Sequence, residues 1–383
     1  MKTKMRSTLG LIFILTFAPG MVSYDANAKT GSTNSASLES ANKLGWDIEI
    51  VDKKGGFSSA LVLDVDGYPQ IAYQAAAPVT PHELNYARWD GSQWVIDVVD
   101  TQGDTGWVVD ALGIDKAGNP HIGYGGNQYA IIKYAHWTGS DWLTEDVGYD
   151  PSDVAYGGAS SALDSNGYPH FAYCAQNWDF KIELRYAHWT GSSWSIEPVD
   201  GSGCWYSTSL RLDANDSPSI SFYDDTHAEL KYARWTGTEW VIQVVDSIGN
   251  VGWPNTLALD ANGNPHIGYY SFTYEKLKYA AWTGADWEIQ DVDSVVGPVN
   301  RLDISLVLDA GDRPHIAYAD GNLKYGYLIE NTWVIDTVDR GEFSVSMRLD
   351  GTGNPQISYN GPSFELKYAV GRPYHNFYLP LIK

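Results

Sequence analysis

Basic residues are scarce in this chain of 383 residues: 25 Lys and Arg stand against 47 Asp and Glu, giving a net charge of −22. An acidic surface repels phosphate backbones and anionic lipids, so nucleic acids and membrane surfaces are not expected partners. No apolar stretch after residue 28 is long enough to cross a bilayer. Nucleophile-elbow, zinc and phosphate-loop motifs are also missing, which leaves the sequence without the signature of those enzyme classes.

The first residues have the features of an export signal. Residues 1–28, "MKTKMRSTLGLIFILTFAPGMVSYDANA", have a basic start, an apolar centre and a small-x-small end. This pattern predicts a cleaved secretory signal peptide and a mature protein that is extracellular or periplasmic. An uncleaved membrane anchor is the alternative, although the apolar run is short for one. Residues 29–44 are rich in Ser, Asn and Thr and are expected to form a flexible linker.

One phrase is repeated seven times along the rest of the chain. An Asp precedes a Pro by five positions, and alternating apolar and aromatic residues follow the Pro, as in "LDANGNPHIGYY" (259–270). The alternation predicts a strand, and the Asp and Gly before it predict a tight turn. The Asp residues of the seven phrases are Asp64, Asp115, Asp164, Asp213, Asp260, Asp309 and Asp350.

A second phrase, "LKYARWTGTEW" in one copy (230–240), places two Trp residues five positions apart around a Gly-containing turn. It predicts a second hairpin, so each unit has four antiparallel strands in a period of about 49 residues. Four strands per unit at such a period are typical of a β-propeller blade. We therefore predict an all-β, seven-bladed β-propeller over residues 45–370, followed by a C-terminal tail over 371–383.

The two ends of the repeat region are incomplete in complementary ways. The seventh unit stops after "LKYAV" without a fourth strand, whereas "GWDIEIVD" (45–52) is a fourth strand that precedes the first unit. The N-terminal strand is therefore expected to complete the last blade and to close the ring.

The "LDxxGNP" turn resembles that of secreted bacterial propeller repeats of the NHL type and related proteins. The Trp-Asp ending of WD40 repeats and the early Trp of the sialidase Asp-box are not present. The resemblance implies a seven-bladed fold and covers about residues 45–370.

The loops between blades, and between second and third strands, vary most and are expected to form the working face. An aromatic residue precedes most inner strands there, and Arg301 replaces it in the sixth unit. Packing between blades is the alternative role for such rings. The ligand-binding residues proposed from this pattern are Phe57, Trp107, Tyr156, Trp178, Trp205, Tyr206, Trp253, Arg301 and Phe343. Carboxylates predicted to bond ligand hydroxyls are Asp104, Asp153, Asp179, Asp224, Asp225, Glu275 and Asp303.

These features favour a monomeric secreted binder of an extracellular ligand, with carbohydrate as the leading candidate. The alternative is a polysaccharide lyase or glycoside hydrolase at the same channel mouth, with these candidate catalytic residues: Asp224, Asp225, His227, Arg301 and Tyr206. A carboxylate pair would suit hydrolysis, and a Tyr or His base with an Arg would suit β-elimination. A protein-interaction platform is the third possibility.

The remaining repeated residues have structural interpretations. The cation of each "KYA" and the Asp of each "VD" are expected to pair across neighbouring strands of one blade. The His after four of the Pro residues is expected to form core hydrogen bonds. No metal site or cofactor is predicted, apart from weak Ca²⁺ loops at the turn Asp residues. Cys174 and Cys204 are predicted to form a disulfide between adjacent blades, with two separate thiols as the alternative.

Overall fold

The computed structural model describes residues 44–55, 58–75, 82–102, 105–126, 131–148, 154–176, 181–205, 207–295 and 302–373. Of residues 106–110, 154 and 156–158 it describes the backbone alone. Residues from Leu44 onward form one compact unit. Every regular element in the described ranges is a β-strand, and these ranges contain no helix that could span a membrane.

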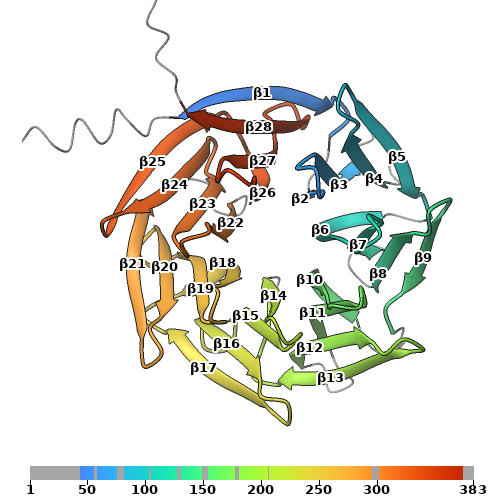
Figure 1. Cartoon of the computed structure of the whole chain (residues 1–383). Helices are drawn as coiled ribbons and strands as arrows, with labels where there is room; N and C mark the ends of the chain where they lie inside the picture. The colour runs from blue at the N-terminus through green and yellow to red at the C-terminus, as the bar shows by residue number, and fades with distance from the viewer. Residues whose placement is uncertain are drawn as a thin grey trace, which may run out of the picture. The chain divides into compact units, whose positions relative to one another are not determined.

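Seven four-stranded antiparallel blades surround a central opening, which confirms the predicted β-propeller (Figure 1). Blades 1 to 3 are β2 (Ser59–Leu63), β3 (Pro69–Ala75), β4 (Glu83–Trp89) and β5 (Trp94–Asp100); β6 (Thr105–Ile114), β7 (Pro120–Gly126), β8 (Ile131–Trp137) and β9 (Trp142–Asp146); and β10 (Val154–Leu163), β11 (Pro169–Gln176), β12 (Ile182–Trp189) and β13 (Trp194–Asp200).

Blades 4 to 6 follow the same order. They are β14 (Thr208–Leu212), β15 (Pro218–Asp224), β16 (Glu229–Trp235) and β17 (Trp240–Asp246); β18 (Val251–Leu259), β19 (Pro265–Ser271), β20 (Lys276–Trp282) and β21 (Trp287–Ser294); and β22 (Asp303–Leu308), β23 (Pro314–Ala319), β24 (Leu323–Ile329) and β25 (Thr332–Asp339). The first strand of each blade lies nearest the centre and the fourth lies at the perimeter (Figure 1).

Blade 7 is composite, as the incomplete ends of the repeat region predict. It contains β26 (Phe343–Leu349), β27 (Pro355–Asn360) and β28 (Leu366–Pro373), and its outer strand is β1 (Leu44–Asp52). β1 pairs antiparallel with β28 from Leu44 opposite Pro373 to Asp52 opposite Leu366. The N-terminal strand β1 therefore covers the edge of β28 that would otherwise be unpaired.

The repeated Asp residues organise the turns between first and second strands. Asp64 Oδ1 accepts the backbone N–H groups of Asp66 (3.0 Å) and Tyr68 (2.8 Å), and the Gly between them has a φ of 82°. A positive φ is strained for residues with a Cβ, which explains the Gly in this phrase. The same side-chain bonds recur in the other six blades.

The second Trp of each hairpin joins one blade to the blade before it. Trp142 in blade 2 packs edge-on against Tyr86 in blade 1, with ring centroids 5.3 Å apart. Such edge-to-face pairs contribute about 0.5–1.5 kcal/mol beyond simple burial. The pairs at the other six interfaces are Trp94–Tyr368, Trp194–Tyr134, Trp240–Tyr186, Trp287–Tyr232, Trp333–Tyr279 and Trp46–Tyr325.

The cation of "KYA" and the Asp of "VD" join neighbouring blades, so the prediction that they pair within one blade is wrong. Lys133 in β8 contacts Asp100 in β5 at 2.5 Å, and the Tyr124 hydroxyl donates to the same carboxylate at 2.6 Å. Asp100 is only 4% exposed. We call this Tyr–Asp–Lys group the interblade clasp; it recurs around Asp246, Asp293 and Asp339.

The four His residues after the Pro form core hydrogen bonds, as predicted. His121 Nδ1 bonds the Tyr134 hydroxyl of the next strand, and its Nε2 lies 3.5 Å from Asp115 in the adjacent turn. Burial lowers the pKa of His121, although the Asp115 carboxylate opposes that shift. The equivalent His–Tyr bonds are His170–Tyr186, His266–Tyr279 and His315–Tyr325.

Candidate functional site

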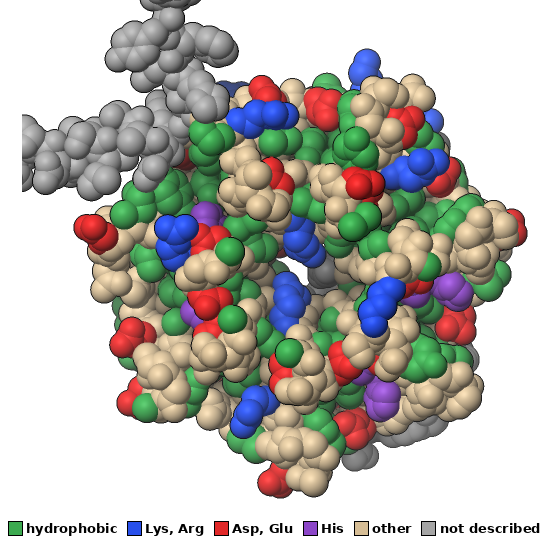
Figure 2. Space-filling model, in the orientation of Figure 1, with side chains coloured by type: hydrophobic (Ala, Val, Ile, Leu, Met, Phe, Trp, Pro, Cys, Tyr) green, Lys and Arg blue, Asp and Glu red, His purple; other side chains and the backbone are tan. Residues whose placement is uncertain are grey.

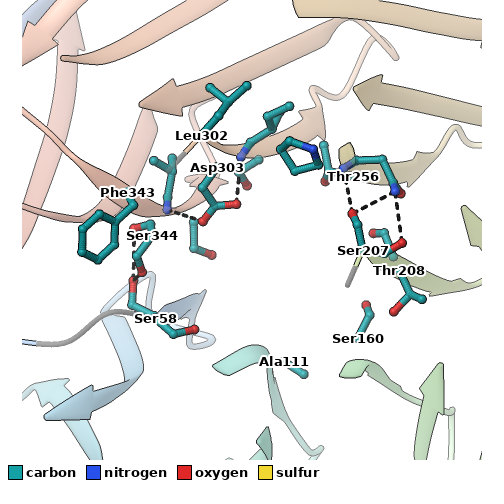
Figure 3. A pocket seen from close by; sticks show the side chains of 18 of the residues that line it. Ser58, Ala111, Ser160, Ser207, Thr208, Thr256, Leu302, Asp303, Phe343 and Ser344 are labelled. Atoms are coloured by element: carbon teal, nitrogen blue, oxygen red, sulfur yellow. Dashed lines mark hydrogen bonds between the residues drawn. The ribbon is translucent and has the colours of Figure 1, made fainter. Parts of the chain in front are cut away.

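A cavity of about 550 Å³ follows the propeller axis and is lined mainly by the inner strands (Figure 3). Because side chains alternate along a strand, every second residue of an inner strand faces the same way. Counting back from the turn Asp, many of the lining residues stand six, four or two positions before it, and the described lining residues at the second position are Arg211 and Arg348. In blade 7 these three positions hold Ser344, Ser346 and Arg348.

Aromatic side chains of blades 5 and 7 line one end of this cavity, where the inner strands begin. Trp253 in β18 lies parallel to Phe272, with ring centroids 5.5 Å apart and an interplanar angle of 12°. Phe343 in β26 lies 6.0 Å from Phe364, which is 37% exposed. Trp253, Phe343 and Phe364 all line the cavity, so this end, called the aromatic mouth below, presents flat apolar surfaces.

Hydroxyl groups form the middle of the wall and also connect the blades. Ser160 Oγ accepts the backbone N–H of Leu210 in the next blade at 2.9 Å, and Ser346 Oγ accepts that of Leu61 at 3.0 Å. Equivalent bonds come from Ser209, Thr256 and Ser305. Blade 2 has Ala111 at this level, and there a backbone bridge pairs β6 with β10 instead. A hydroxyl that accepts such a bond still has a proton to donate.

Amide side chains are fixed at the same wall. Asn255 Nδ2 donates to the Ser207 hydroxyl (2.9 Å) and to the Gly252 carbonyl (2.9 Å), while its Oδ1 accepts from Ser221 at 2.6 Å. Gln74 is fully buried and donates to the Thr105 carbonyl at 3.2 Å. Its Oε1 has no hydrogen-bond partner among the described residues. The wall therefore combines oriented donors and acceptors with little freedom to rearrange.

Asp303 is the one carboxylate among the described residues that line the cavity. It accepts the backbone N–H groups of Val345 (2.8 Å) and of Ile304 (2.9 Å). Burial raises the pKa of Asp303 to about 6, and the two N–H bonds only partly counter this shift. The sequence pattern predicted Asp303 as a polar group of the working face, and the structure places it on the cavity wall (Figure 3).

Replacing Asp303 with Asn is expected to change how stability depends on pH. Because the folded-state pKa lies above the unfolded value, the charged carboxylate destabilises the fold as pH rises from about 4 through 6. Asp303→Asn should thus be more stable than the wild type above pH 6, by at most about 3 kcal/mol, and equal to it near pH 3.5. Urea unfolding at both pH values measures this difference. A difference between Asp303→Asn and the wild type that is the same at both pH values would contradict the assignment.

The opposite end of the cavity carries two arginines. Arg211 lies near the end of β14 and Arg348 near the end of β26, each next to the turn that leads to the second strand. Blades 4 and 7 face each other across the opening in Figure 1, and Figure 2 shows Lys or Arg side chains on opposite sides of it. Burial lowers the pKa of both guanidinium groups to about 10. We call this end the arginine floor.

Blade 4 departs from the repeat in a second place, at its loop between β15 and β16. Phe222 stands where the clasps of other blades have Tyr, and Asp224 enters the group instead. Asp224 is fully buried and contacts Lys231 (2.6 Å), His227 Nδ1 (2.8 Å) and the Ser202 hydroxyl (3.0 Å). Despite its burial, these partners lower the pKa of Asp224. His227 is 56% exposed, so an imidazole oriented by a buried carboxylate faces solvent.

Asp224, His227 and Glu229 lie close enough together to hold a metal ion, with ligand atoms within 4.8 Å of one another. The ammonium group of Lys231 lies 2.6 Å from Asp224 and 3.8 Å from Glu229. A cation already neutralises both carboxylates, so the group reads as an ion-pair network and not as a metal site.

The predicted disulfide is present. Cys174 at the end of β11 is bonded to Cys204 in the loop before β14, and both residues are buried. The bridge joins blade 3 to the loop that packs on the Asp224 region: a Cβ on Gly203 would lie 2.7 Å from Asp225 Oδ1.

Removing this disulfide is expected to lower the free energy of unfolding by about 3–4 kcal/mol, because it closes a 30-residue loop in the unfolded chain. The measurement is urea unfolding of the double variant Cys174→Ala/Cys204→Ala against the wild type. Reductant should lower the stability of the wild type and leave that of the variant unchanged. Equal stabilities of the two proteins would show that the bridge contributes nothing.

The structure brings only part of the predicted site together. Trp253 and Phe343 are at the aromatic mouth; Trp205 lies beside Cys204; Asp224, Asp225 and His227 share the blade 4 loop. Trp107 and Tyr156 lie within β6 and β10 and not before them, and their side chains are not described. Seven predicted residues lie outside the described ranges: Phe57, Asp104, Asp153, Trp178, Asp179, Tyr206 and Arg301. Their ligand-binding roles stay predictions.

The chain matches no protein-family model and no curated protein. Among solved structures it is similar to an ulvan lyase from a new family of polysaccharide lyases, solved bound to GlcA(1-4)Rha3S (14% identity, TM-score 0.55, covering 84% of this chain and 96% of that chain). It is also similar to a protein of unknown function from Dyadobacter fermentans (10% identity, TM-score 0.51, covering 85% of this chain and 99% of that chain). A third similar structure is a variant of Aleuria aurantia lectin in complex with Fucα1-6GlcNAc (13% identity, TM-score 0.49, covering 76% of this chain and 98% of that chain). Likenesses at these identities show the fold alone.

Proposed function

We propose that the protein is secreted and binds carbohydrate in its central cavity, which the ligand enters from the aromatic mouth. The observation that carries this proposal is one cavity in which apolar rings at the entrance lead to a wall of fixed hydroxyl and amide groups. A sugar ring has an apolar face for stacking and a rim of hydroxyls for hydrogen bonds. A volume of about 550 Å³ lies in the usual range for small-ligand sites.

Two further features support the proposal. A disulfide persists in an oxidising compartment, which agrees with the export signal predicted for residues 1–28. A glycan ligand also agrees with the similarity to the ulvan lyase, which was solved bound to GlcA(1-4)Rha3S. The differences among the seven blades favour one axial site per chain over seven equivalent ones, so we propose a monomer with a single ligand.

The test is a panel of soluble polysaccharides followed by intrinsic Trp fluorescence. Saturable quenching by at least one glycan is expected, and Trp253→Ala should weaken that binding about tenfold or more because it removes a stacking surface. The matched control is Trp282→Ala, which removes a Trp of an outer hairpin packed on Trp287 and should leave affinity unchanged. If no glycan binds, or if Trp253→Ala binds as tightly as the wild type, the proposal is wrong.

A second function, cleavage of a glycan at the blade 4 loop and outside the residues that line the central cavity, is favoured by the Asp224–His227 pair. The imidazole Nδ1 is held by a buried carboxylate, which leaves Nε2 free to accept a proton from a substrate. Asp224 itself is enclosed, so the carboxylate pair with Asp225 that hydrolysis would use is not presented to solvent. If the wild type produces new reducing ends and His227→Gln does not, while both bind the glycan, the protein cleaves the glycan. Binding without new reducing ends would show that the protein binds the glycan and does not cleave it.

A further inference from the structure

The two arginines of the floor occupy a position of the inner strands that is apolar in the other five blades. Arg211 and Arg348 occupy the second position before the turn Asp, in "LRLDANDSP" and "MRLDGTGNP". The same position in the other five blades carries a small or branched apolar residue, namely Val62, Gly113, Ala162, Ala258 and Val307. The two arginines are therefore individual departures from the repeat and are not part of the structural pattern that closes each blade.

Neither arginine has a carboxylate partner among the described residues. Arg211 donates to the Leu210 carbonyl at 2.7 Å and Arg348 donates to the Met347 carbonyl at 2.7 Å, which uses one N–H of the five in each guanidinium. By contrast, three arginines elsewhere in the fold each contact an acidic side chain within 3 Å: Arg185, Arg313 and Arg372. In a chain with 47 acidic and 25 basic residues, two arginines without a carboxylate partner in the described ranges are unusual.

The two guanidinium groups line the same cavity, one from blade 4 and one from blade 7. Burial lowers the pKa of both, and the positive charge of Arg348 adds to the lowering for Arg211. Like charges held together in a partly desolvated cavity destabilise the empty protein, and an anion placed between them removes that penalty. Asp303 does not serve as the anion between the two arginines, because it lies at the start of β22 and already accepts two backbone N–H bonds there.

We propose that the cavity selects acidic saccharides, and that a carboxylate group of a uronic acid residue binds between Arg211 and Arg348. This inference rests on the proposed carbohydrate-binding function and adds the substrate class. The saccharide would stack at the aromatic mouth, bond the hydroxyl wall along its length and place its acidic group at the floor. Guanidinium groups recognise carboxylates through paired N–H bonds, which adds directional specificity to the charge. A sulfate ester offers the same anionic oxygens and is distinguished by experiment.

The experiment is isothermal titration of the full mature chain with three oligosaccharide probes. Trigalacturonate supplies carboxylates, maltotriose is neutral, and sucrose octasulfate supplies sulfates. Trigalacturonate is expected to bind at least tenfold more tightly than maltotriose, with affinity that falls as salt rises. The double variant Arg211→Gln/Arg348→Gln should lose about 100-fold in affinity for trigalacturonate and little for maltotriose.

Matched controls are Arg88→Gln and Arg234→Gln, which neutralise exposed arginines of third strands and should not change any affinity. If the double variant fails to fold, Arg211→Lys and Arg348→Lys keep the charge but lose the paired geometry, and an intermediate loss is then expected.

The outcomes separate the two proposals. Tight binding of trigalacturonate that the arginine variants abolish supports the uronate assignment. A preference for sucrose octasulfate that depends on the same arginines overturns the uronate and assigns a sulfate ester in its place. Maltotriose binding equal to that of trigalacturonate, or binding that the variants do not alter, overturns acidic selection and leaves the carbohydrate site standing. Failure of all three probes and of the polysaccharide panel overturns both.

Discussion

A chain that lacks β1 (Leu44–Asp52) is expected to lose the closed ring and most of its resistance to heat. The deletion exposes the edge of β28 along its whole length. It also removes Trp46 from Tyr325 and takes away the Asp52 carboxylate that accepts the Tyr73 hydroxyl at 2.7 Å. We expect the apparent melting temperature to fall by on the order of 10 °C or more, and the transition to broaden.

Circular dichroism melting of the deletion variant measures this effect. A synthetic peptide with the sequence "LGWDIEIVD" should restore part of the lost stability, whereas a scrambled peptide should not. The matched point variant is Ile48→Ala, which shortens a side chain of β1 that is 40% exposed and should change stability little. An unchanged melting temperature after deletion of β1 would contradict closure of the ring by this strand.

Substituting Asp100 with Ala is expected to destabilise the protein by about 3–5 kcal/mol, the cost of leaving the partner of a buried ion pair alone. Asp100 is the centre of the interblade clasp between blades 1 and 2, where it accepts from Tyr124, Lys133 and the backbone N–H of Gln102. Once Asp100 is removed, Lys133, whose side chain is only 13% exposed, has no carboxylate in contact among the described residues. Urea unfolding measures the loss.

Two companion variants separate charge from packing in the same clasp. Tyr124→Phe removes one hydrogen bond and should cost about 1 kcal/mol, in line with the Phe that blade 4 carries naturally at position 222. Glu288→Ala removes an exposed carboxylate from a fourth strand and should stay within about 0.5 kcal/mol of the wild type. If Asp100→Ala matched Glu288→Ala, the clasp would have no role in holding the blades together.

The architecture could be predicted from the sequence because its determinants are local. The Asp, Gly and Pro of each turn specify backbone conformations within a few residues, and alternation after the Pro specifies a strand. The incomplete ends of the repeat region then determined how the ring closes, since β1 is the one fourth strand without its own blade. The disulfide followed from two cysteines at equivalent ends of adjacent blades.

Contacts between blades were harder to predict because they depend on how whole sheets stack. Lys231 is opposite Val244 in its own blade, near Asp246, yet it contacts Asp200 of the preceding blade. The strand register alone favoured the wrong partner. The hydroxyl groups of the cavity wall could not be predicted for the same reason: Ser160 accepts a bond from the backbone of Leu210, which lies 50 residues away in the next inner strand.

The candidate site shows a similar division. Aromatic residues at the start of inner strands drew attention to Trp253 and Phe343, which do line the cavity. Arg211 and Arg348 were overlooked, although a position-by-position alignment of the seven phrases would have marked them as charged residues in an apolar column. In a repeat protein, such single departures are the signal that separates a site from the scaffold that carries it.

A crystal structure of the protein with trigalacturonate determines whether a saccharide binds in the central cavity. The expected result is ligand density on the propeller axis, with a sugar ring against Trp253 and a carboxylate within hydrogen-bonding distance of Arg211 and Arg348. Ordered ligand density confined to the outer edges of the blades, with an empty cavity, would contradict binding in the cavity.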